Sequence, residues 1–293
     1  MNYSLKSNEN YTKEQLETIF GTNFGARIKG ITLRRQPDGA PYALVFSRAD
    51  GPYDDRIEGD SFYYDGEGTN KDQVLTAANK ALVNANTAGR VIYGFRQDES
   101  GGLWRYLGII EVVDFAYVLK GSYMTYEFHF MAQPIGPDEL QQAEVTIEQT
   151  LLEAPQLTEP AAMTTVSIRA RKAAFRIHIK RLYENTCVVC RKKRLSDAGY
   201  PEVEAAHIYP KEKLGADDYR NGVALCKLHH WAFDSGLLTF SDDLTVIVKP
   251  EIISDDNYTE IAAYADEPIL LPTDQRLSPD KLYIRAHREL HGL

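Results

Sequence analysis

Cysteine, long apolar runs and basic residues are all scarce in this 293-residue chain. Its three cysteines are an odd number, which argues against a secreted disulfide framework. No stretch approaches 18 consecutive apolar residues, so we expect no membrane-spanning helix. The opening residues MNYSLKSNEN lack the apolar region of a signal peptide, and we therefore expect a cytoplasmic location.

Lysine and arginine, 33 against 42 acidic residues, are concentrated in one stretch. Residues 166–194 contain ten basic residues and one acid, a local charge of +9 in a chain of net charge −9. A solvated helix face can carry such a run, but concentrated positive charge is also typical of contact with DNA phosphates. The expected contacts to the DNA backbone are Arg169, Arg171, Lys172, Arg176, Lys180 and Arg181.

Residues 133–165 carry six acids, four prolines and no lysine or arginine, which is typical of a linker with at most a short helix. The chain is thereby divided into an N-terminal domain, 1–132, and a C-terminal domain, 166–293.

Period-two alternation predicts that the N-terminal domain consists mainly of strands. In YMTYEFHFM (123–131), Phe128 and Phe130 share a face with Met124 and Tyr126. ALVFS, RVIYGF and LGIIEVVDF are similar runs, whereas KDQVLTAANKALVNAN (71–86) has helical spacing. Many strands around one helix predict a twisted sheet that curls toward a barrel.

The C-terminal domain should alternate helices with short strands. We expect a basic helix at 166–184, strands ending near AAHI and at GVALC, and a hairpin at LLTFSDDLTVIV. The remaining helices are expected at KLHHWAFD and at SPDKLYIRAHRELH, with Pro279 in the first turn of the latter. The fold class is α+β.

All three cysteines fall in two closely spaced pairs. Cys187 and Cys190 have C-x2-C spacing, and Cys226 and His229 have C-x2-H spacing. Together they complete a Cys3His tetrahedron, which is typical of structural zinc, Zn2+. The alternative is three buried free cysteines. In a small unit, such a zinc ion supplies on the order of 10 kcal/mol of folding free energy.

Around these pairs lie EAAHIYP (204–210), RNGVALC (220–226) and HHWAFDSG (229–236). About residues 180–250 resemble the zinc-stapled HNH nucleases of the ββα-metal type. The resemblance implies that His207 is the general base and that His230 binds a catalytic divalent ion, Mg2+ or Mn2+. Asn221 would orient His207 or hold the metal loop.

These residue types suit phosphodiester hydrolysis. A neutral imidazole takes a proton from water near pH 7, and a divalent ion neutralises the charge that develops on the phosphate. One position departs from the pattern, because Ala206 stands where many family members have a metal-binding Asp or His. Glu204, Asp234 or water would complete the metal shell, and a catalytically inactive chain is an alternative.

The N-terminal stretches PYDDRIEGDSFYYDGEG (52–68) and DQVLTAANKAL (72–82) resemble the SRA, or YDG, domain over about residues 15–133. The resemblance implies a PUA-like twisted β-barrel that flips a modified cytosine out of duplex DNA. An ordinary strand core with a glycine turn is the alternative explanation of these aromatic residues.

The modified-base pocket implied by this resemblance contains four residues. Tyr53 and Tyr64 would stack on the base, and Asp55 would accept from the cytosine N4 amino group. Asp65 stands where family members often have a small hydroxyl residue near the 5-substituent. An acid there would favour 5-hydroxymethylcytosine over 5-methylcytosine.

The two resemblances together predict a restriction-like endonuclease that cuts double-stranded DNA near 5-methyl- or 5-hydroxymethylcytosine, as in defence against modified phage DNA. Because an HNH domain has one active centre, a double-strand break requires a homodimer or two nicks. Two alternatives remain at this point: an HNH nuclease directed by another ligand or modification, and an inactive reader of modified DNA.

Overall fold

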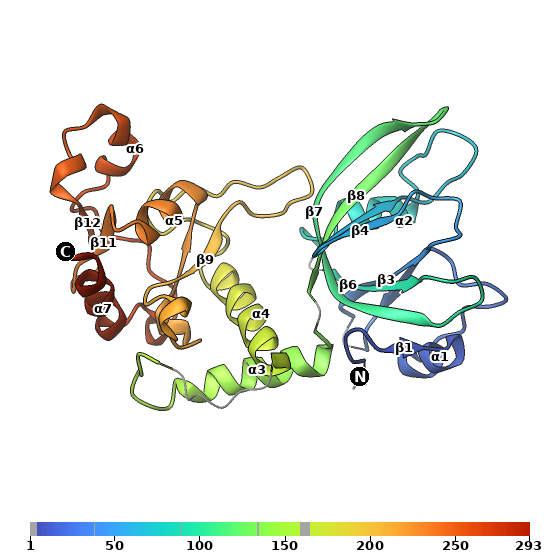
Figure 1. Cartoon of the computed structure of the whole chain (residues 1–293), viewed down its shortest axis with the longest axis horizontal. Coiled ribbons are helices and arrows are strands. Elements are labelled where there is room, and N and C mark those ends of the chain that lie inside the picture. Colours follow the sequence, from blue (N-terminus) through green and yellow to red (C-terminus); the bar gives the residue numbers. More distant parts are fainter. Residues whose placement is uncertain (1–4, 38, 89, 134, 159–164) are drawn as a thin grey trace. The chain divides into compact units, whose positions relative to one another are not determined.

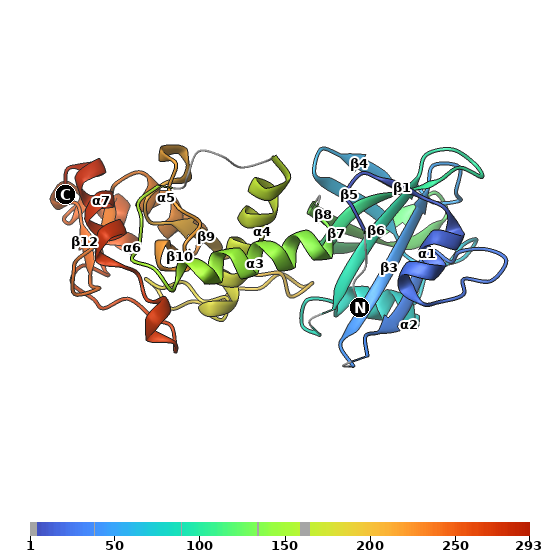
Figure 2. The ribbon, with the colours of Figure 1, turned by 90° about the horizontal axis from the view of Figure 1, so that it is seen from below.

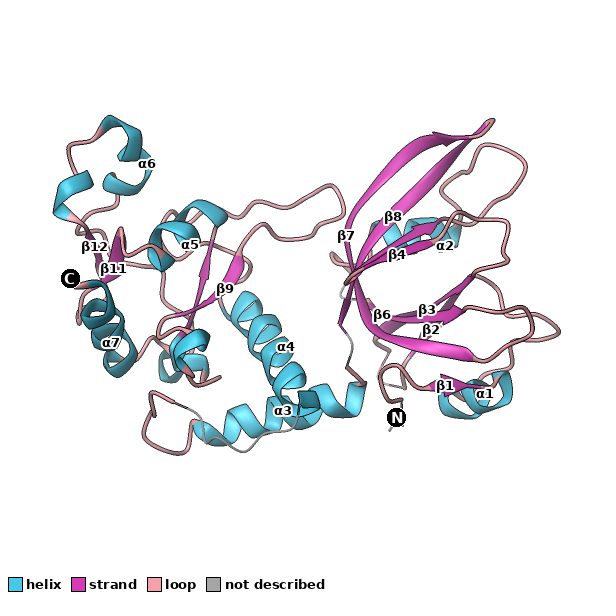
Figure 3. Ribbon diagram, in the orientation of Figure 1, coloured by secondary structure: helices cyan, strands magenta, loops and turns pink. Residues whose placement is uncertain are grey.

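The computed structural model describes residues 5–37, 39–88, 90–133, 135–158 and 165–293. It confirms the predicted α+β class (Figures 1 and 3). The chain divides into two compact units: unit 1 is Met1–Glu139 with Leu195–Tyr200, and unit 2 is Leu140–Arg194 with Pro201–Leu293. Within these described ranges, no helix combines the length and the apolar character that crossing a membrane requires.

Unit 1 is built on one eight-stranded sheet with the strand order β2-β3-β6-β7-β8-β5-β4, and β1 pairs with β7. The β3–β6 pair is parallel and the other pairs are antiparallel. Figure 1 shows the long β7–β8 hairpin that extends from this sheet. The elements are β1 (Asn10–Tyr11), α1 (Lys13–Phe20), β2 (Ile31–Arg35), β3 (Pro41–Arg48), β4 (Arg56–Glu58), β5 (Ser61–Asp65), α2 (Ala77–Val83), β6 (Val91–Gln97), β7 (Trp104–Lys120) and β8 (Tyr123–Gln133).

Both faces of the sheet are buried, because successive side chains of β3 enter two different cores. Ala43 and Val45 pack in a core with α2, which also contains Phe128 and Phe130. Leu44 and its neighbours on the other face pack in a core with α1, which lies beside β3 in Figure 2. The prediction that Phe128 and Phe130 of β8 face the core is therefore confirmed.

The helix predicted at 71–86 is shorter, since α2 begins only after its N-cap, Thr76. The preceding residues have other partners. The backbone amide of Gln73 donates to the Met124 carbonyl, and the Gln73 side chain donates to the turn that follows β5. These contacts hold the chain in a non-helical path.

Unit 2 contains most of the residues after the sheet. Its elements are α3 (Pro137–Thr150, which begins in unit 1), α4 (Thr165–Leu182), β9 (Glu204–His207), β10 (Gly222–Leu225), α5 (Lys227–Asp234), β11 (Leu238–Phe240), β12 (Val246–Val248), α6 (Thr259–Ala262) and α7 (Lys281–His291). The segment predicted as an acidic linker thus contains α3, while residues 134 and 159–164 of it lie outside the described ranges.

The hairpin of β9 and β10, with helices α4 and α5 packed against it, forms the centre of unit 2. β9 and β10 pair antiparallel, with His207 opposite Gly222. A Cβ atom at Gly222 would lie 2.5 Å from Ile179 and 2.7 Å from Phe175, so the absence of a side chain lets α4 pack closely on the hairpin.

The closing helix α7 begins at Lys281 with Asp280 as N-cap. Pro279 therefore precedes the helix, and its predicted place in the first turn is wrong.

Candidate nuclease centre and base-reading pocket

The four predicted zinc ligands lie together in unit 2. The ligand atoms of Cys187, Cys190, Cys226 and His229 are all within 4.8 Å of one another. Nδ1 of His229 is 3.6 Å from Sγ of Cys187 and 3.1 Å from Sγ of Cys226. These separations fit a tetrahedral ion with bonds of roughly 2.0–2.3 Å. Cys3His is a donor set that zinc prefers, and the cluster could hold that ion.

The two adjacent histidines of α5 have different partners. Nε2 of His229 lies 3.4 Å from the carbonyl oxygen of Glu260, which leaves Nδ1 directed at the sulfur atoms. The ring of His230 lies between two carboxylates instead, with Nδ1 2.7 Å from Oε2 of Glu204 and Nε2 3.4 Å from Oδ2 of Asp234. The hydrogen bond to Glu204 raises the pKa of His230.

Glu204 reaches His230 from the strand opposite Leu225. Side chains alternate along a strand, so Glu204 and Ala206 point to the same face of β9. The hydrogen bond with His230 lowers the pKa of Glu204, and the charges of Lys227 and Lys180 lower it further. Ala206 has no side chain that could bind a metal ion. Glu204, two residues earlier on the same face, supplies a carboxylate near the positive charges of Lys227 and Lys180.

The ring of His207, the last residue of β9, is held from two directions. Its Nε2 lies 2.9 Å from Oδ1 of Asp217. Its face stacks on Phe175 of α4, with ring centroids 3.9 Å apart and planes 6° apart. The side chain is 14% exposed, so water reaches it. No hydrogen bond or ion pair joins His207 to His230 within the described ranges.

Asp217 is buried among positive charges. Its Oδ2 lies 2.8 Å from Nζ of Lys211 and 3.7 Å from Nε of Arg171. Burial raises the pKa of Asp217, but the hydrogen bonds from His207 and Lys211 outweigh burial and bring the pKa below its ordinary value. The carboxylate is therefore ionised at neutral pH.

Asn221 is fully buried and ties together the loop between β9 and β10. Its Oδ1 accepts from the Tyr209 amide at 2.8 Å, and its Nδ2 donates to the carbonyls of Tyr209 and Ala216 at 3.1 and 2.9 Å. Its side-chain bonds thus go to the loop backbone. Of the two roles considered from the sequence, these contacts correspond to holding the loop.

The basic residues of α4 differ in accessibility. Arg169, Lys172 and Arg181 are exposed, and Arg176 and Lys180 are half-buried. Arg171 is buried beside Asp217. The exposed and half-buried members are therefore the ones accessible to a phosphate backbone.

In unit 1, the turn after β5 gathers the predicted pocket residues. The Asp65 amide donates to Oδ1 of Asp55 at 2.9 Å, and the Gly68 amide donates to the Tyr53 hydroxyl at 3.2 Å. Tyr53 is half-buried. Tyr64 is 2% exposed, and its ring packs against Phe62 at 5.8 Å in the core.

The turn itself is held by two side chains that the motif at 72–82 supplies. Nε2 of Gln73 donates to the carbonyls of Gly66 and Gly68 at 2.7 and 3.0 Å. Oδ1 of Asn79 accepts from the Glu67 amide at 2.7 Å. A Cβ atom at Gly66 would lie 2.7 Å from Oδ1 of Asn79, so this approach requires glycine.

The two acids of the pocket have different surroundings. Burial raises the pKa of Asp55 to about 6, although the Asp65 amide donates to it. Asp65 is paired with Lys120, at 2.7 Å. Lys120 also contacts Glu127, at 2.5 Å. Sequence inspection missed Lys120, because its partner lies 55 positions away in the chain.

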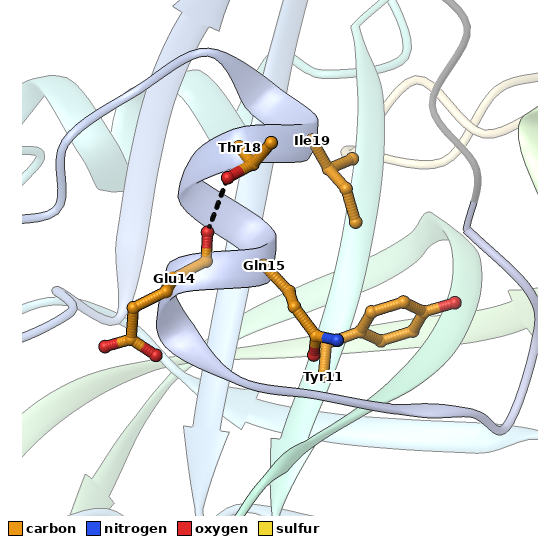
Figure 4. Close-up of a pocket in the computed structure, with 5 residues that line it drawn as sticks. All are labelled: Tyr11, Glu14, Gln15, Thr18 and Ile19. Atoms are coloured by element: carbon orange, nitrogen blue, oxygen red, sulfur yellow. Dashed lines mark hydrogen bonds between the residues drawn. The ribbon is translucent and has the colours of Figure 1, made fainter.

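A separate surface pocket of about 440 Å3 lies on α1, lined by Tyr11, Glu14, Gln15, Thr18 and Ile19 (Figure 4). The Thr18 hydroxyl donates to the Glu14 carbonyl within it. Its lining has one carboxylate and lacks histidine and cysteine, so it offers no cluster for hydrolytic chemistry.

Two protein families match separate parts of the chain. The family described as "ScoMcrA-like, SRA domain" matches residues 8–155. The chain belongs to this SRA family. The family "HNH endonuclease" matches residues 187–241, which include the Cys3His cluster, His207, Asn221 and His230. This SRA protein is therefore an endonuclease of the HNH type. A comparison with curated proteins finds no match.

Solved structures resemble the SRA–HNH chain at low identity. The "Modification dependent TagI restriction endonuclease" has a TM-score of 0.54 and 20% identity, over 98% of this chain and 92% of that one. The SUVH5 SRA domain with methylated CHH DNA has a TM-score of 0.37 and 21% identity, over 46% of this chain and 92% of that one. The phosphorothioation-dependent endonuclease ScoMcrA has a TM-score of 0.34 and 18% identity, over 78% of this chain and 51% of that one. The TagI match establishes the shared fold.

Asp55 gives a testable consequence of burying a carboxylate in the SRA unit. Because its folded-state pKa is raised from 3.8 to about 6, the protonated form stabilises the fold at low pH, and this stabilisation is lost as the pH rises through 6. Asp55→Asn keeps a hydrogen-bond acceptor without the charge. We expect the variant to be more stable at pH 8 by up to roughly 3 kcal/mol, with a gain that shrinks toward pH 4.

Thermal unfolding of the Asp55→Asn variant at pH 5 and pH 8 measures this difference. Asp54→Asn, at an exposed neighbouring position, is the matched control and should change unfolding little at either pH. A variant less stable than the wild type at pH 8 would contradict the expectation.

Proposed function

We propose that this SRA–HNH endonuclease cuts double-stranded DNA in response to a 5-modified cytosine, 5-methyl or 5-hydroxymethyl. The observation that carries the proposal is that one chain contains both an SRA domain and an HNH domain. In the SRA domain, the turn after β5 brings Tyr53, Asp55 and Asp65 together. TagI, which has the same fold over nearly all of this chain, is described as modification-dependent. The same dependence is proposed here.

The reading step would use the acids beside the β5 turn. A flipped cytosine presents its N4 amino group as a donor, and the Asp55 carboxylate is a matching acceptor. Tyr53 would stack on the base. Tyr64 is in the core, so stacking by Tyr64 requires the base to displace its present neighbours. The Asp65–Lys120 pair supplies an acceptor and a donor, which suits a hydroxymethyl group better than a methyl group.

The cutting step would use His207 as the general base. Its ring is partly exposed, and Asp217 and Phe175 fix its orientation. His207 takes the proton from the attacking water, and Asn221 holds the loop that carries Asp217. A divalent ion, Mg2+ or Mn2+, when bound, neutralises the charge that develops on the scissile phosphate.

Glu204 and His230 are the residues proposed to hold this ion. Oε2 of Glu204 lies 2.7 Å from Nδ1 of His230, so this carboxylate and this imidazole would be the two side chains that hold the ion. Asp234 contacts the other ring nitrogen, as outer carboxylates commonly do beside a metal-binding histidine. Glu204 thus takes over the function for which Ala206 has no donor.

The accessible basic residues of α4 would bind the DNA backbone without sequence preference, and their contribution should weaken as salt concentration rises. Each chain has one HNH centre. A double-strand break therefore requires a homodimer or two successive nicks.

Cleavage of matched DNA tests the proposal. Identical plasmids with cytosine, 5-methylcytosine or 5-hydroxymethylcytosine are incubated with Mg2+ or Mn2+ and the full chain. We expect cutting of modified DNA alone, and a loss of roughly 10²-fold or more in His207→Ala with DNA binding retained. Tyr53→Ala should lose the preference for modified DNA.

Two outcomes contradict separate parts of the proposal. Equal cutting of all three plasmids would exclude the reading of cytosine modification. Binding of modified DNA without cutting under either metal would exclude catalysis through the proposed centre.

Glu204→Gln tests the proposed ion site separately. Removing the anionic oxygen should weaken Mn2+ binding by roughly 10-fold or more, measured by titration and electron paramagnetic resonance. Glu212→Gln, an exposed acid that the structure places near Asp234, is the matched control for the change of charge. Equal Mn2+ affinity of the two variants would exclude Glu204 as a ligand.

A further inference from the structure

Three features restrain the ring of His207. Asp217 contacts Nε2 at 2.9 Å, and Phe175 covers one face at a centroid distance of 3.9 Å. The pairing of His207 with Gly222 fixes its backbone at the end of β9. Because the ring cannot flip or tilt without breaking one of these contacts, the nitrogen that faces Asp217 is fixed.

Asp217 is itself held in place. Asn221 binds the Tyr209 and Ala216 backbone at the two ends of the loop that leads to Asp217. Lys211 lies 2.8 Å from the second carboxylate oxygen, Oδ2. The carboxylate therefore keeps Oδ1 directed at the histidine while its negative charge is compensated on the other side.

An ionised carboxylate can only accept hydrogen bonds, so Nε2 of a neutral His207 must carry the proton. Nδ1 then has the free lone pair. In the described part of the chain, no protein group forms a hydrogen bond with Nδ1 of His207. With 14% of its side chain exposed, this ring can receive a proton from water at Nδ1.

We propose that Asp217 is the positioning residue of the nuclease centre: it holds His207 in the tautomer protonated at Nε2, so that Nδ1 accepts the proton of the attacking water. As the proton moves from water to Nδ1, His207 becomes an imidazolium and the ionised Asp217 stabilises its charge. The proposal rests on the proposed function, in which His207 is the general base.

The charges that face this pair come from the loop after β9 and from α4. Asp217 and Lys211 lie on the loop after β9, and Arg171 lies on α4. Both cations approach Oδ2 of Asp217, whereas His207 contacts Oδ1. His178 of α4 stacks on Tyr219 instead, at 3.6 Å. The nearest charge to the imidazolium is thus the Asp217 carboxylate.

Asp217→Asn is the primary variant, because an amide has nearly the same shape but no charge, and it can donate to Nε2 and so favour the wrong tautomer. We expect single-turnover cleavage of modified DNA to fall on the order of 10²-fold, with zinc content and DNA affinity unchanged. Without the anion, the imidazolium is less favoured. The acid limb of the pH–rate profile should therefore move to lower pH.

Two controls separate positioning from a general loss of structure. Asp218→Asn makes the same change at the next position, where the carboxylate contacts Arg220. It should leave the acid limb in place. In a double-mutant cycle, Asp217→Asn should cause no further loss in the His207→Ala background, because Asp217 acts through His207.

Ring nitrogen chemical shifts of His207, measured by NMR on the zinc-loaded chain without DNA, test the tautomer independently of activity. We expect protonation at Nε2 in the wild type and a change in Asp217→Asn. An active chain whose Asp217→Asn variant keeps the wild-type rate and acid limb would overturn the proposal, as would a wild-type proton at Nδ1. A chain that cuts no DNA but shows the expected shifts would fail the proposed function alone.

Discussion

The Cys3His cluster is the constraint on which the geometry of the nuclease unit depends. Cys187 and Cys190 follow α4, and the Val188 amide between them donates to the Ala224 carbonyl of β10. Cys226 is the N-cap of α5. The cluster therefore joins a helix, a hairpin and a second helix that the chain separates by 36 residues. Phe175 of α4 stacks on His207, and His230 belongs to α5, so both candidate catalytic rings depend on this junction.

Buried carboxylates are used in opposite ways in the two units. Asp217 is close to Lys211 and Arg171, and its pKa is lowered. Asp55 is close to Arg96 and Ser47, but burial dominates and raises its pKa to about 6. The first arrangement gives a permanently charged partner for a histidine. The second leaves a carboxylate whose charged form is disfavoured by burial.

Residue spacing was sufficient to predict the features that local geometry controls. The four cluster residues were predicted from their C-x2-C and C-x2-H spacing, and all four lie together. The helix predicted at KLHHWAFD has the same bounds as α5. The sequence offers Glu204 and Asp234 as candidates for the metal shell of His230, and both contact that ring. The contact of Asp217 with His207 could not be predicted, because it depends on how the loop after β9 closes. The helix expected at 71–86 was shortened by Gln73, whose long-range bonds to the β5 turn outweigh helical propensity.

The separation of the two adjacent histidines is the central claim, since His230 is free for chemistry only if His229 alone completes the Cys3His cluster. Loading the chain with Co2+ tests it directly, because tetrahedral cobalt with thiolate ligands has intense visible and near-ultraviolet absorption. We expect this spectrum to be retained in His230→Ala and lost or strongly altered in His229→Ala. Loss of the tetrahedral spectrum in His230→Ala, with the His229→Ala spectrum unchanged, would contradict the assignment.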